Sequence, residues 1–210
     1  MLARTIFRVR LGFRVRLVFD LVRASTAPYD ARMSEYLRWR IGGGTYFFTI
    51  VTYKRKPILC SDFAREKLRE AIASVRKRRP FEIKAIVLLP DHLHTVWTLP
   101  QNDADYSTRI RQIKTLFTRS FDENGVSQNP SRKKRAEHEI WQRRFYEHTV
   151  RDDKDLKHCV DYIHINPVKH KLVKSVKNWK WSSFHRYVKL GEYEQDWCTD
   201  MKWFGDEFME

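Results

Sequence analysis

The sequence predicts an α+β domain with the ferredoxin-like split β-α-β pattern, in which an antiparallel sheet has helices on one face. Two observations lead to this prediction. Runs rich in aromatic and β-branched residues alternate with amphipathic segments in the order β-α-β-β-α-β, and one further helix follows. The chain has 210 residues, of which 42% are hydrophobic, so it can bury the core of one domain of ordinary size.

The first half of the domain is predicted to contain three strands and one helix. Residues 45–53, TYFFTIVTY, have the composition of a strand. Ser61 is a candidate N-cap for the helix that follows, and Pro80 ends that helix. Residues 81–89 and 92–99 are the next two strands. The Pro-Asp turn between them predicts that they pair as a hairpin.

The second half is predicted to contain two helices and a fourth strand. Residues 106–121 have the periodicity of an amphipathic helix, and residues 124–139 have the composition of an exposed loop. The strand is expected over residues 140–150. The last helix begins near Asp152 and should end before Pro167. Four aromatic residues beyond it indicate a docked helix or coil; they are Trp179, Trp181, Phe184 and Tyr187.

We expect one domain, residues 33–197, followed by a C-terminal tail, residues 198–210. Residues 1–32 stand apart because they repeat the pentapeptide FRVRL and are rich in arginine. They have features of a targeting segment or of an added nucleic-acid-binding arm. The interpretation we prefer is a disordered extension or a mis-assigned start, with translation beginning at Met33.

The charge balance predicts a polyanionic partner. Lys and Arg number 41 against 26 Asp and Glu, which gives a net charge of +15 and a pI near 9.9. Nucleic acid fits such a chain better than a membrane does. An unspecialised basic surface is the alternative, but the basic residues form clusters: residues 76–79, the tetrad Arg132, Lys133, Lys134 and Arg135, and the pair Arg143 and Arg144.

Cysteine usage and hydropathy predict a cytoplasmic protein. The chain has three cysteines far apart and no C-x-x-C motif, so neither a disulfide framework nor a zinc knuckle is indicated. No run of 18 apolar residues is present, and we expect no contact with a membrane.

His92 and His94 are the first candidate functional residues. Residues i and i+2 of a strand point to the same side, so the two imidazoles should lie next to each other. That arrangement suits two ligands of one metal ion. A pair of hydrogen-bonded histidines with no function is an equally weighted alternative on this motif alone.

Tyr162 and Asn166 are the second pair of candidates. They are four residues apart and therefore share one side of a helix. An amide oxygen can coordinate a cation, and a phenol can act as a nucleophile. Taken alone, a tyrosine at the edge of the core and a helix-capping asparagine are the favoured interpretations.

The four residues together suit one reaction. The histidines and Asn166 would hold an ion that polarises a phosphate, and Tyr162 would attack the phosphorus. A phosphotyrosyl link and a free hydroxyl would result. The chain has no Walker-type nucleotide loop, so the covalent link itself would store the energy for rejoining.

Five stretches of the chain resemble the REP-associated tyrosine transposases, which belong to the HUH single-tyrosine superfamily. They are residues 43–59, 88–100, 141–152, 161–173 and 181–197. The motifs P-D-H-x-H, W-Q-x-R-F and Y-I-H-x-N-P-V-K-H occur in this order, and their combination is specific. One departure is Lys171, where the family often has glycine; we expect this to change a helix C-cap and not the chemistry.

The resemblance implies roles for these residues. His92 and His94 match the pair that binds Mg²⁺ or Mn²⁺, and Asn166 matches the third ligand. Tyr162 matches the nucleophile that joins the 5′ end of cleaved DNA. Family members act in bacteria on single-stranded DNA hairpins, often repeated extragenic palindromes, so we expect a cytoplasmic protein that associates with the nucleoid when it acts. The resemblance leaves open whether the protein is a monomer or a homodimer.

Basic residues near these motifs are candidate DNA contacts. They are Arg143, Arg144, Lys169, Arg132, Lys133, Lys134 and Arg135. A non-catalytic protein that binds DNA hairpins is the main alternative function, although the four site residues are intact. An RNA-recognition module and a metallohydrolase are less well supported, because the RNP1 motif and a carboxylate base are both missing from the sequence.

Overall fold

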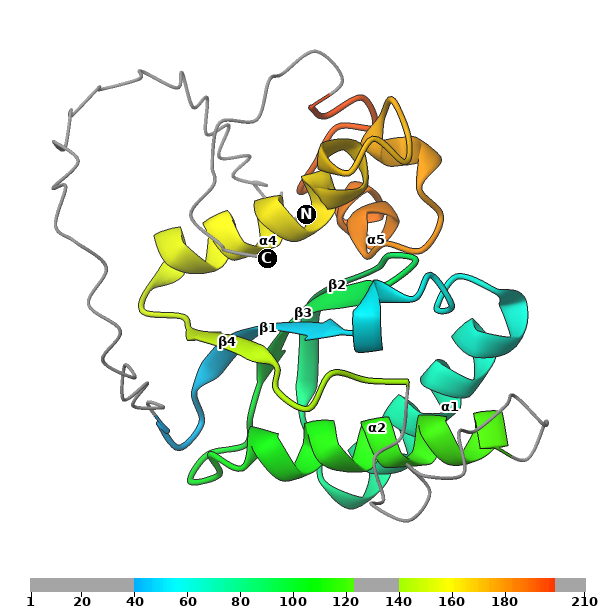
Figure 1. Ribbon diagram of the computed structural model, residues 1–210. Helices are drawn as coiled ribbons and strands as arrows, with labels where there is room; N and C mark the ends of the chain where they lie inside the picture. The colour runs from blue at the N-terminus through cyan, green and yellow to red at the C-terminus, as the bar shows by residue number, and fades with distance from the viewer. Residues whose placement is uncertain (1–39, 123–139, 199–210) are drawn as a thin grey trace, which may run out of the picture. The chain divides into compact units, whose positions relative to one another are not determined.

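The computed structural model describes residues 40–122 and 140–198 (Figure 1). The extension 1–32, the basic tetrad at 132–135 and all of the C-terminal tail except Cys198 lie outside the described residues. No helix within the described ranges is long and apolar enough to cross a bilayer.

Four strands form one antiparallel sheet in the order β2-β3-β1-β4. They are β1 (Thr45–Val51), β2 (Glu82–Leu88), β3 (His92–Thr98) and β4 (Tyr146–Thr149). Strands β2 and β3 form the predicted hairpin, with Leu88 opposite Leu93. This strand order is that of the ferredoxin-like fold, so the predicted α+β class is confirmed.

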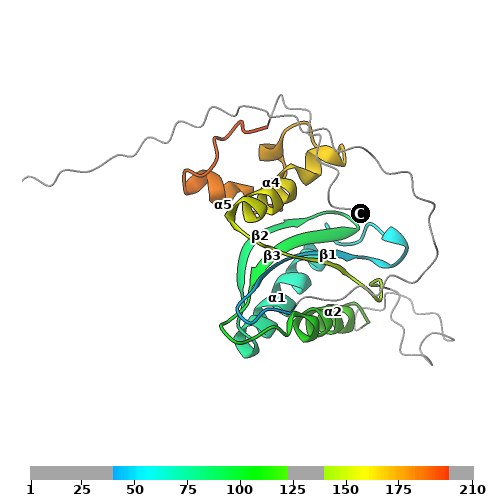
Figure 2. The same ribbon diagram turned by 90° about the vertical axis from the view of Figure 1, so that its left-hand side faces the viewer.

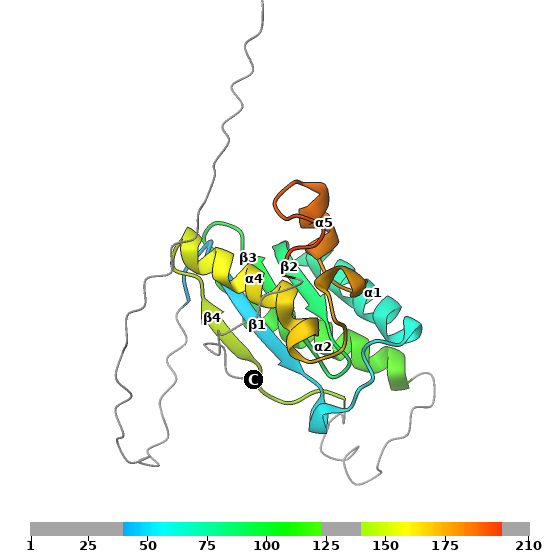
Figure 3. The same cartoon turned by 90° about the horizontal axis from the view of Figure 1, so that it is seen from above.

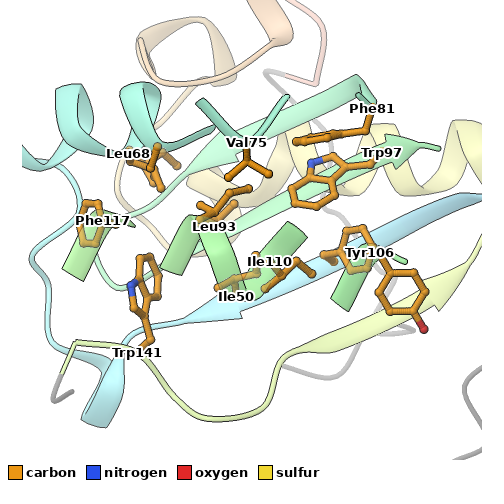
Figure 4. Close-up of a cluster of buried hydrophobic side chains, with 14 of the residues drawn as sticks. Ile50, Leu68, Val75, Phe81, Leu93, Trp97, Tyr106, Ile110, Phe117 and Trp141 are labelled. Atoms are coloured by element: carbon orange, nitrogen blue, oxygen red, sulfur yellow. The ribbon is translucent and has the colours of Figure 1, made fainter. Parts of the chain in front are cut away.

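Helices α1 (Asp62–Arg78) and α2 (Tyr106–Asp122) cover one face of the sheet (Figure 1). The helix α1 begins as predicted, with the Ser61 hydroxyl accepting a hydrogen bond from the Ala64 amide at 3.2 Å. Figure 4 shows the core between these helices and the sheet, in which the rings of Phe81 and Trp97 lie 4.2 Å apart.

A third helix, α4 (Asp153–Lys169), covers the opposite face (Figures 1 and 2). The expectation of helices on one face therefore holds for α1 and α2 but not for α4. The physical reason is that both faces of the sheet are apolar. Phe47, Val87 and Val96 point away from the α1–α2 core and are fully buried against residues of α4.

The predicted strand 140–150 is shorter in the structure, because it is interrupted by a bulge. Thr49 pairs with Tyr146, and Thr52 pairs with Trp141. Three positions along one strand thus face five along the other, so the segment before β4 carries two extra residues. Arg143 and Arg144 lie in this bulge, exposed to solvent, and not on a regular strand.

Pro167 does not end the last helix as predicted. The amide of His170 donates to the Asn166 carbonyl, and the amide of Leu172 donates to the Pro167 carbonyl, so the turn after the proline keeps its hydrogen bonds. Asn166 is consequently inside α4 and fully buried. Lys171 follows the C-cap with φ of 57°, the left-handed conformation that explains why glycine is common there.

The C-terminal segment docks on the edge of the sheet as predicted, through a short helix η2 (Val176–Asn178) and the helix α5 (Phe184–Lys189). The indole nitrogen of Trp179 donates to the Leu88 carbonyl at 2.9 Å. The Ser183 hydroxyl accepts from the Ile86 amide at 2.9 Å. These bonds cover the otherwise open edge of strand β2.

Candidate metal and tyrosine site

Strand β3 presents His92 and His94 to the α4 face of the sheet, while Leu93 points into the α1–α2 core. The two imidazole centroids lie 4.8 Å apart, with the ring planes at 83°. Both side chains are buried, with exposed fractions of 1% for His92 and 0% for His94. The structure thus brings the two imidazoles together away from bulk water.

Each histidine is held through its Nδ1 atom. His92 Nδ1 lies 2.6 Å from Asp91 Oδ1, and His94 Nδ1 lies 2.9 Å from the Thr49 hydroxyl. The carboxylate behind His92 Nδ1 is the arrangement typical of a histidine that binds a metal through Nε2. Among the described residues, the buried His92 Nε2 has no hydrogen-bond partner. Such an atom suits a bound cation, so the residues present fit a metal ion.

Arg55 extends this arrangement behind Asp91. Its guanidinium lies 3.1 Å from Asp91 Oδ2. Burial would raise the pKa of the Asp91 carboxyl, but its hydrogen bonds and charge interactions with His92 and Arg55 lower that pKa to about 2. Asp91 is therefore a carboxylate at neutral pH.

The turn that carries Arg55 has an uncommon backbone. Lys54 and Arg55 both have positive φ values, 54° and 50°, although neither is glycine. The Thr52 hydroxyl lies 2.8 Å from the Asp91 carbonyl and 2.9 Å from the Lys56 carbonyl, which ties the turn to the start of β3. Sequence reasoning missed this turn, because lysine and arginine carry no signal for the left-handed conformation.

Helix α4 crosses the sheet, as seen from above in Figure 3, and it contacts β3, the strand that carries the histidines. Tyr162, Asn166 and His170 are each four residues apart and form one stripe along it. The Tyr162 ring lies 5.4 Å from that of His94, and the His170 ring lies 5.0 Å from that of His92. Asn166 lies between Tyr162 and His170 along this stripe, so we expect its side chain to face the histidine pair. Tyr162 and Asn166 are fully buried.

Lys169 contributes a positive charge to the tyrosine. Its ammonium donates to the Tyr162 hydroxyl at 3.3 Å and lies 4.9 Å from the ring centroid. Of the predicted DNA contacts within the described residues, Lys169 is thus the one that touches the site. Arg143 and Arg144 lie in the bulge, whose backbone is held by Lys114: the ammonium donates to the Gln142 carbonyl at 2.5 Å.

The ligands predicted from the sequence would supply two imidazole nitrogens and an amide oxygen. Imidazole favours borderline cations, whereas Mg²⁺ prefers oxygen ligands, so the set suits Mn²⁺ better than Mg²⁺. A second group of ligand-type side chains, His148, Asp155 and Cys159, lies on β4 and the first half of α4.

Comparisons with known proteins identify the family. The model described as "Transposase IS200 like" matches residues 42–166, which is more than half of the chain. A REP-associated tyrosine transposase of Escherichia coli (strain K12) is 46% identical over 170 residues, covering 80% of this chain and 93% of the relative. This chain belongs to the REP-associated tyrosine transposases. The matched range contains both histidines, Tyr162 and Asn166.

Two further matches support the same family assignment for this transposase. A relative from Haemophilus influenzae is 47% identical over 176 residues, covering 83% of this chain and 99% of the relative. A solved structure described as a REP-associated tyrosine transposase bound to a REP hairpin has a TM-score of 0.69 and 44% identity. That match covers 85% of this transposase and all of the solved chain.

Proposed function

We propose that this transposase cuts and rejoins single-stranded DNA next to hairpins, through a covalent bond between Tyr162 and a 5′ phosphate. One observation carries the proposal. The buried Tyr162–Asn166 stripe of α4 packs on the buried His92–His94 pair of β3, although the two segments are far apart in the sequence. Core packing alone does not require such a collection of polar side chains.

In the proposed reaction, the Tyr162 oxygen forms a bond to phosphorus, and the bond between phosphorus and the 3′ oxygen breaks. The phenol loses a proton and the leaving 3′ oxygen gains one, so the step is neutral overall. Lys169 places its charge beside the phenol oxygen while the proton leaves. A divalent ion held by His92, His94 and Asn166 would polarise the phosphate. Attack by another 3′ hydroxyl reverses the step and rejoins DNA.

The charge distribution along the chain indicates where DNA approaches. Residues 167–191 contain seven Lys and Arg and no Asp or Glu. The exposed lysines of this segment include Lys171, Lys174, Lys177 and Lys180. The start of α4, in contrast, carries Asp152, Asp153 and Asp155. The DNA backbone is therefore expected at the C-terminal end of α4, next to Lys169.

Access to the tyrosine requires a change in the site. Tyr162, His94 and Asn166 are all fully buried, so a phosphodiester cannot reach them as they stand. We infer that DNA binding moves the residues that cover these side chains, so that a phosphodiester can reach them. The same burial favours the second candidate function, a hairpin-binding protein that does not cleave, because such a protein would have no need to open.

A labelling experiment separates the two functions. The protein is mixed with Mn²⁺ and a hairpin oligonucleotide flanked by single strands, labelled at its 3′ or its 5′ end, and resolved on a denaturing protein gel. The proposal expects the 3′ label on the protein and the 5′ label on a shortened free strand. Tyr162→Phe and EDTA should abolish both products.

Tyr187→Phe is the matched control, because it removes a phenol that bonds the Lys84 carbonyl on β2. It should form the adduct as the wild type does. Tight hairpin binding without any adduct would instead support the non-catalytic function. An adduct formed by Tyr162→Phe would show that another residue is the nucleophile.

A further inference from the structure

We propose that His148, Asp155 and Cys159 form a second metal site, distinct from the histidine pair, for a borderline cation such as Zn²⁺. One potential ligand atom from each side chain lies within 4.8 Å of the other two. Imidazole nitrogen, carboxylate oxygen and thiolate sulfur are the three donor types that zinc uses in proteins. This inference does not depend on the proposed strand transfer.

The spacing of the donors is close to that of a zinc site. Asp155 Oδ1 lies 3.0 Å from His148 Nε2 and 4.0 Å from Cys159 Sγ. In a tetrahedral site with bonds of about 2.0–2.3 Å, ligand atoms are about 3.3–3.7 Å apart. Shifts of about 1 Å or less in side-chain position would therefore bring the three donors around one ion.

The Asp155 carboxylate is already oriented to bind a cation. Its other oxygen, Asp155 Oδ2, accepts hydrogen bonds from the Arg151 amide at 3.0 Å and from Arg151 Nε at 3.2 Å. The Asp155 amide donates to the Asp152 side chain at 2.8 Å, which fixes the first turn of α4. Such outer contacts position a metal ligand, with Oδ1 near both His148 and Cys159 and Oδ2 at 2.9 Å from His148 Nε2.

Burial leaves one side of the cluster open. Cys159 is fully buried and the Asp155 side chain is 10% exposed, whereas that of His148 is 21% exposed. Water can therefore reach the cluster past His148 and supply a fourth ligand. Without a cation, burial raises the pKa of the Cys159 thiol to about 12. On binding, the thiol proton is released to solvent and a bond from sulfur to the metal replaces the S–H bond.

The cluster uses other side chains than the first site, and its position between β4 and α4 has a structural consequence. His148 is opposite Phe47 on the outer side of β1, and Cys159 is one helical turn before Tyr162. An ion there would tie β4 to the helix that carries the tyrosine. We therefore expect the cation to stabilise the folded chain, since binding to the folded state alone raises its stability.

Cobalt spectroscopy tests the inference on the full metal-free chain. Co²⁺ bound at this cluster should produce a thiolate-to-cobalt charge-transfer band, and in His92→Ala, which lacks a ligand of the first site, this band should saturate at one equivalent. Cys159→Ser should remove the band, and His148→Gln, at a partly exposed position, should weaken binding at least tenfold. Zn²⁺ should raise the melting temperature of His92→Ala, which lacks a ligand of the first site, by several degrees, and leave that of the double variant His92→Ala/Cys159→Ser unchanged.

Two controls locate the site. Cys60→Ser removes a half-buried thiol elsewhere and should keep the band, as should His92→Ala, which removes a ligand of the first site. Circular dichroism verifies that each variant is folded. A wild type without a charge-transfer band, or a band that survives Cys159→Ser, would overturn the inference and leave the cluster as a hydrogen-bonded ion pair.

Discussion

At the scale of single residues, the orientation of His92 depends on a carboxylate. Asp91 holds its Nδ1 atom, and Arg55 bonds the other oxygen of Asp91. A carboxylate behind an imidazole fixes the ring and makes the metal-facing nitrogen a better donor. The Arg55 side chain is 43% exposed, so solvent screens its charge, and it should matter less than Asp91.

The variant Asp91→Asn should weaken Mn²⁺ binding by about 10- to 100-fold, because the amide keeps the size of the side chain but loses its charge. Calorimetric titration of the protein without DNA measures the dissociation constant. Asp62→Asn, on the exposed start of α1, is the matched loss of a carboxylate and should bind as the wild type does. Equal affinities for wild type and Asp91→Asn would contradict this role.

His164 should make stability depend on pH. Burial, together with the charges of Arg186 and His185, lowers its pKa to about 3, and its Nε2 lies 2.8 Å from the Ser183 hydroxyl. The unfolded chain takes up a proton below about pH 6.5, while the folded chain does not. The free energy of unfolding should therefore fall as pH decreases from 6.5, by at most about 1.4 kcal/mol per pH unit from this group.

Denaturant unfolding at pH 7 and pH 5 measures this effect. His164→Gln removes the titrating group, so its free energy of unfolding should fall less between the two values than that of the wild type. An equal decrease in both proteins would show that His164 does not cause the acid sensitivity.

At the scale of elements, the end of α4 contains a strained residue. Lys171 has φ of 57°, a conformation that costs residues other than glycine about 1 kcal/mol. Lys171→Gly should therefore raise the free energy of unfolding by about 0.5–1 kcal/mol. Lys174→Gly, at an exposed position without positive φ, should lower it, and thermal unfolding distinguishes the two. A loss of stability in Lys171→Gly would contradict the prediction.

The lysine-rich segment after α4 gives a prediction for DNA binding. Replacing Lys174, Lys177 and Lys180 by Gln should reduce the salt dependence of hairpin binding, by about 0.7 in the log–log slope for each DNA phosphate that the protein no longer neutralises. A matched triple, Arg69, Lys77 and Arg78 to Gln, changes the same charge on α1 across the sheet. Fluorescence anisotropy at several salt concentrations should show a smaller slope for the first triple only.

Most of the elements could be predicted from the sequence, because periodicity and capping residues are local signals. The Ser61 cap and the β2–β3 hairpin are examples. The bulge before β4 could not, since it depends on how far β1 extends as a partner. The face covered by α4 was missed for a similar reason: alternation identifies two apolar faces but does not say which helix covers which.

The candidate site, like the fold, could be predicted only in part from the sequence. Sequence spacing alone predicted that His92 and His94 share one side of a strand and that Tyr162 and Asn166 share one side of a helix. Thr49, which bonds His94, and Arg55, which bonds Asp91 behind His92, were not predicted. Their positions depend on the β1–β3 register and on a left-handed turn. The proline after Asn166 suggested a helix end, but the bonds of the following turn keep Asn166 inside α4.

At the scale of the whole molecule, the two layers of helices have different structural roles. Helices α1 and α2 supply the large apolar core on one face of the sheet, whereas α4 closes the other face over polar side chains. The net charge of +15 favours a polyanionic partner, and we expect the acid-free segment 167–191 to direct DNA to the C-terminal end of α4. Tyr162 lies where this segment meets the histidine pair.

The central claim is that Tyr162 forms the covalent bond to DNA, and peptide mapping of the adduct tests it most directly. The protein is incubated with a hairpin oligonucleotide and Mn²⁺, digested with nuclease and protease, and the peptides are measured by mass spectrometry. The account predicts a nucleotide on the peptide that contains Tyr162, absent when EDTA is added. A nucleotide on any other residue, or none when the hairpin is bound to saturation, would contradict it.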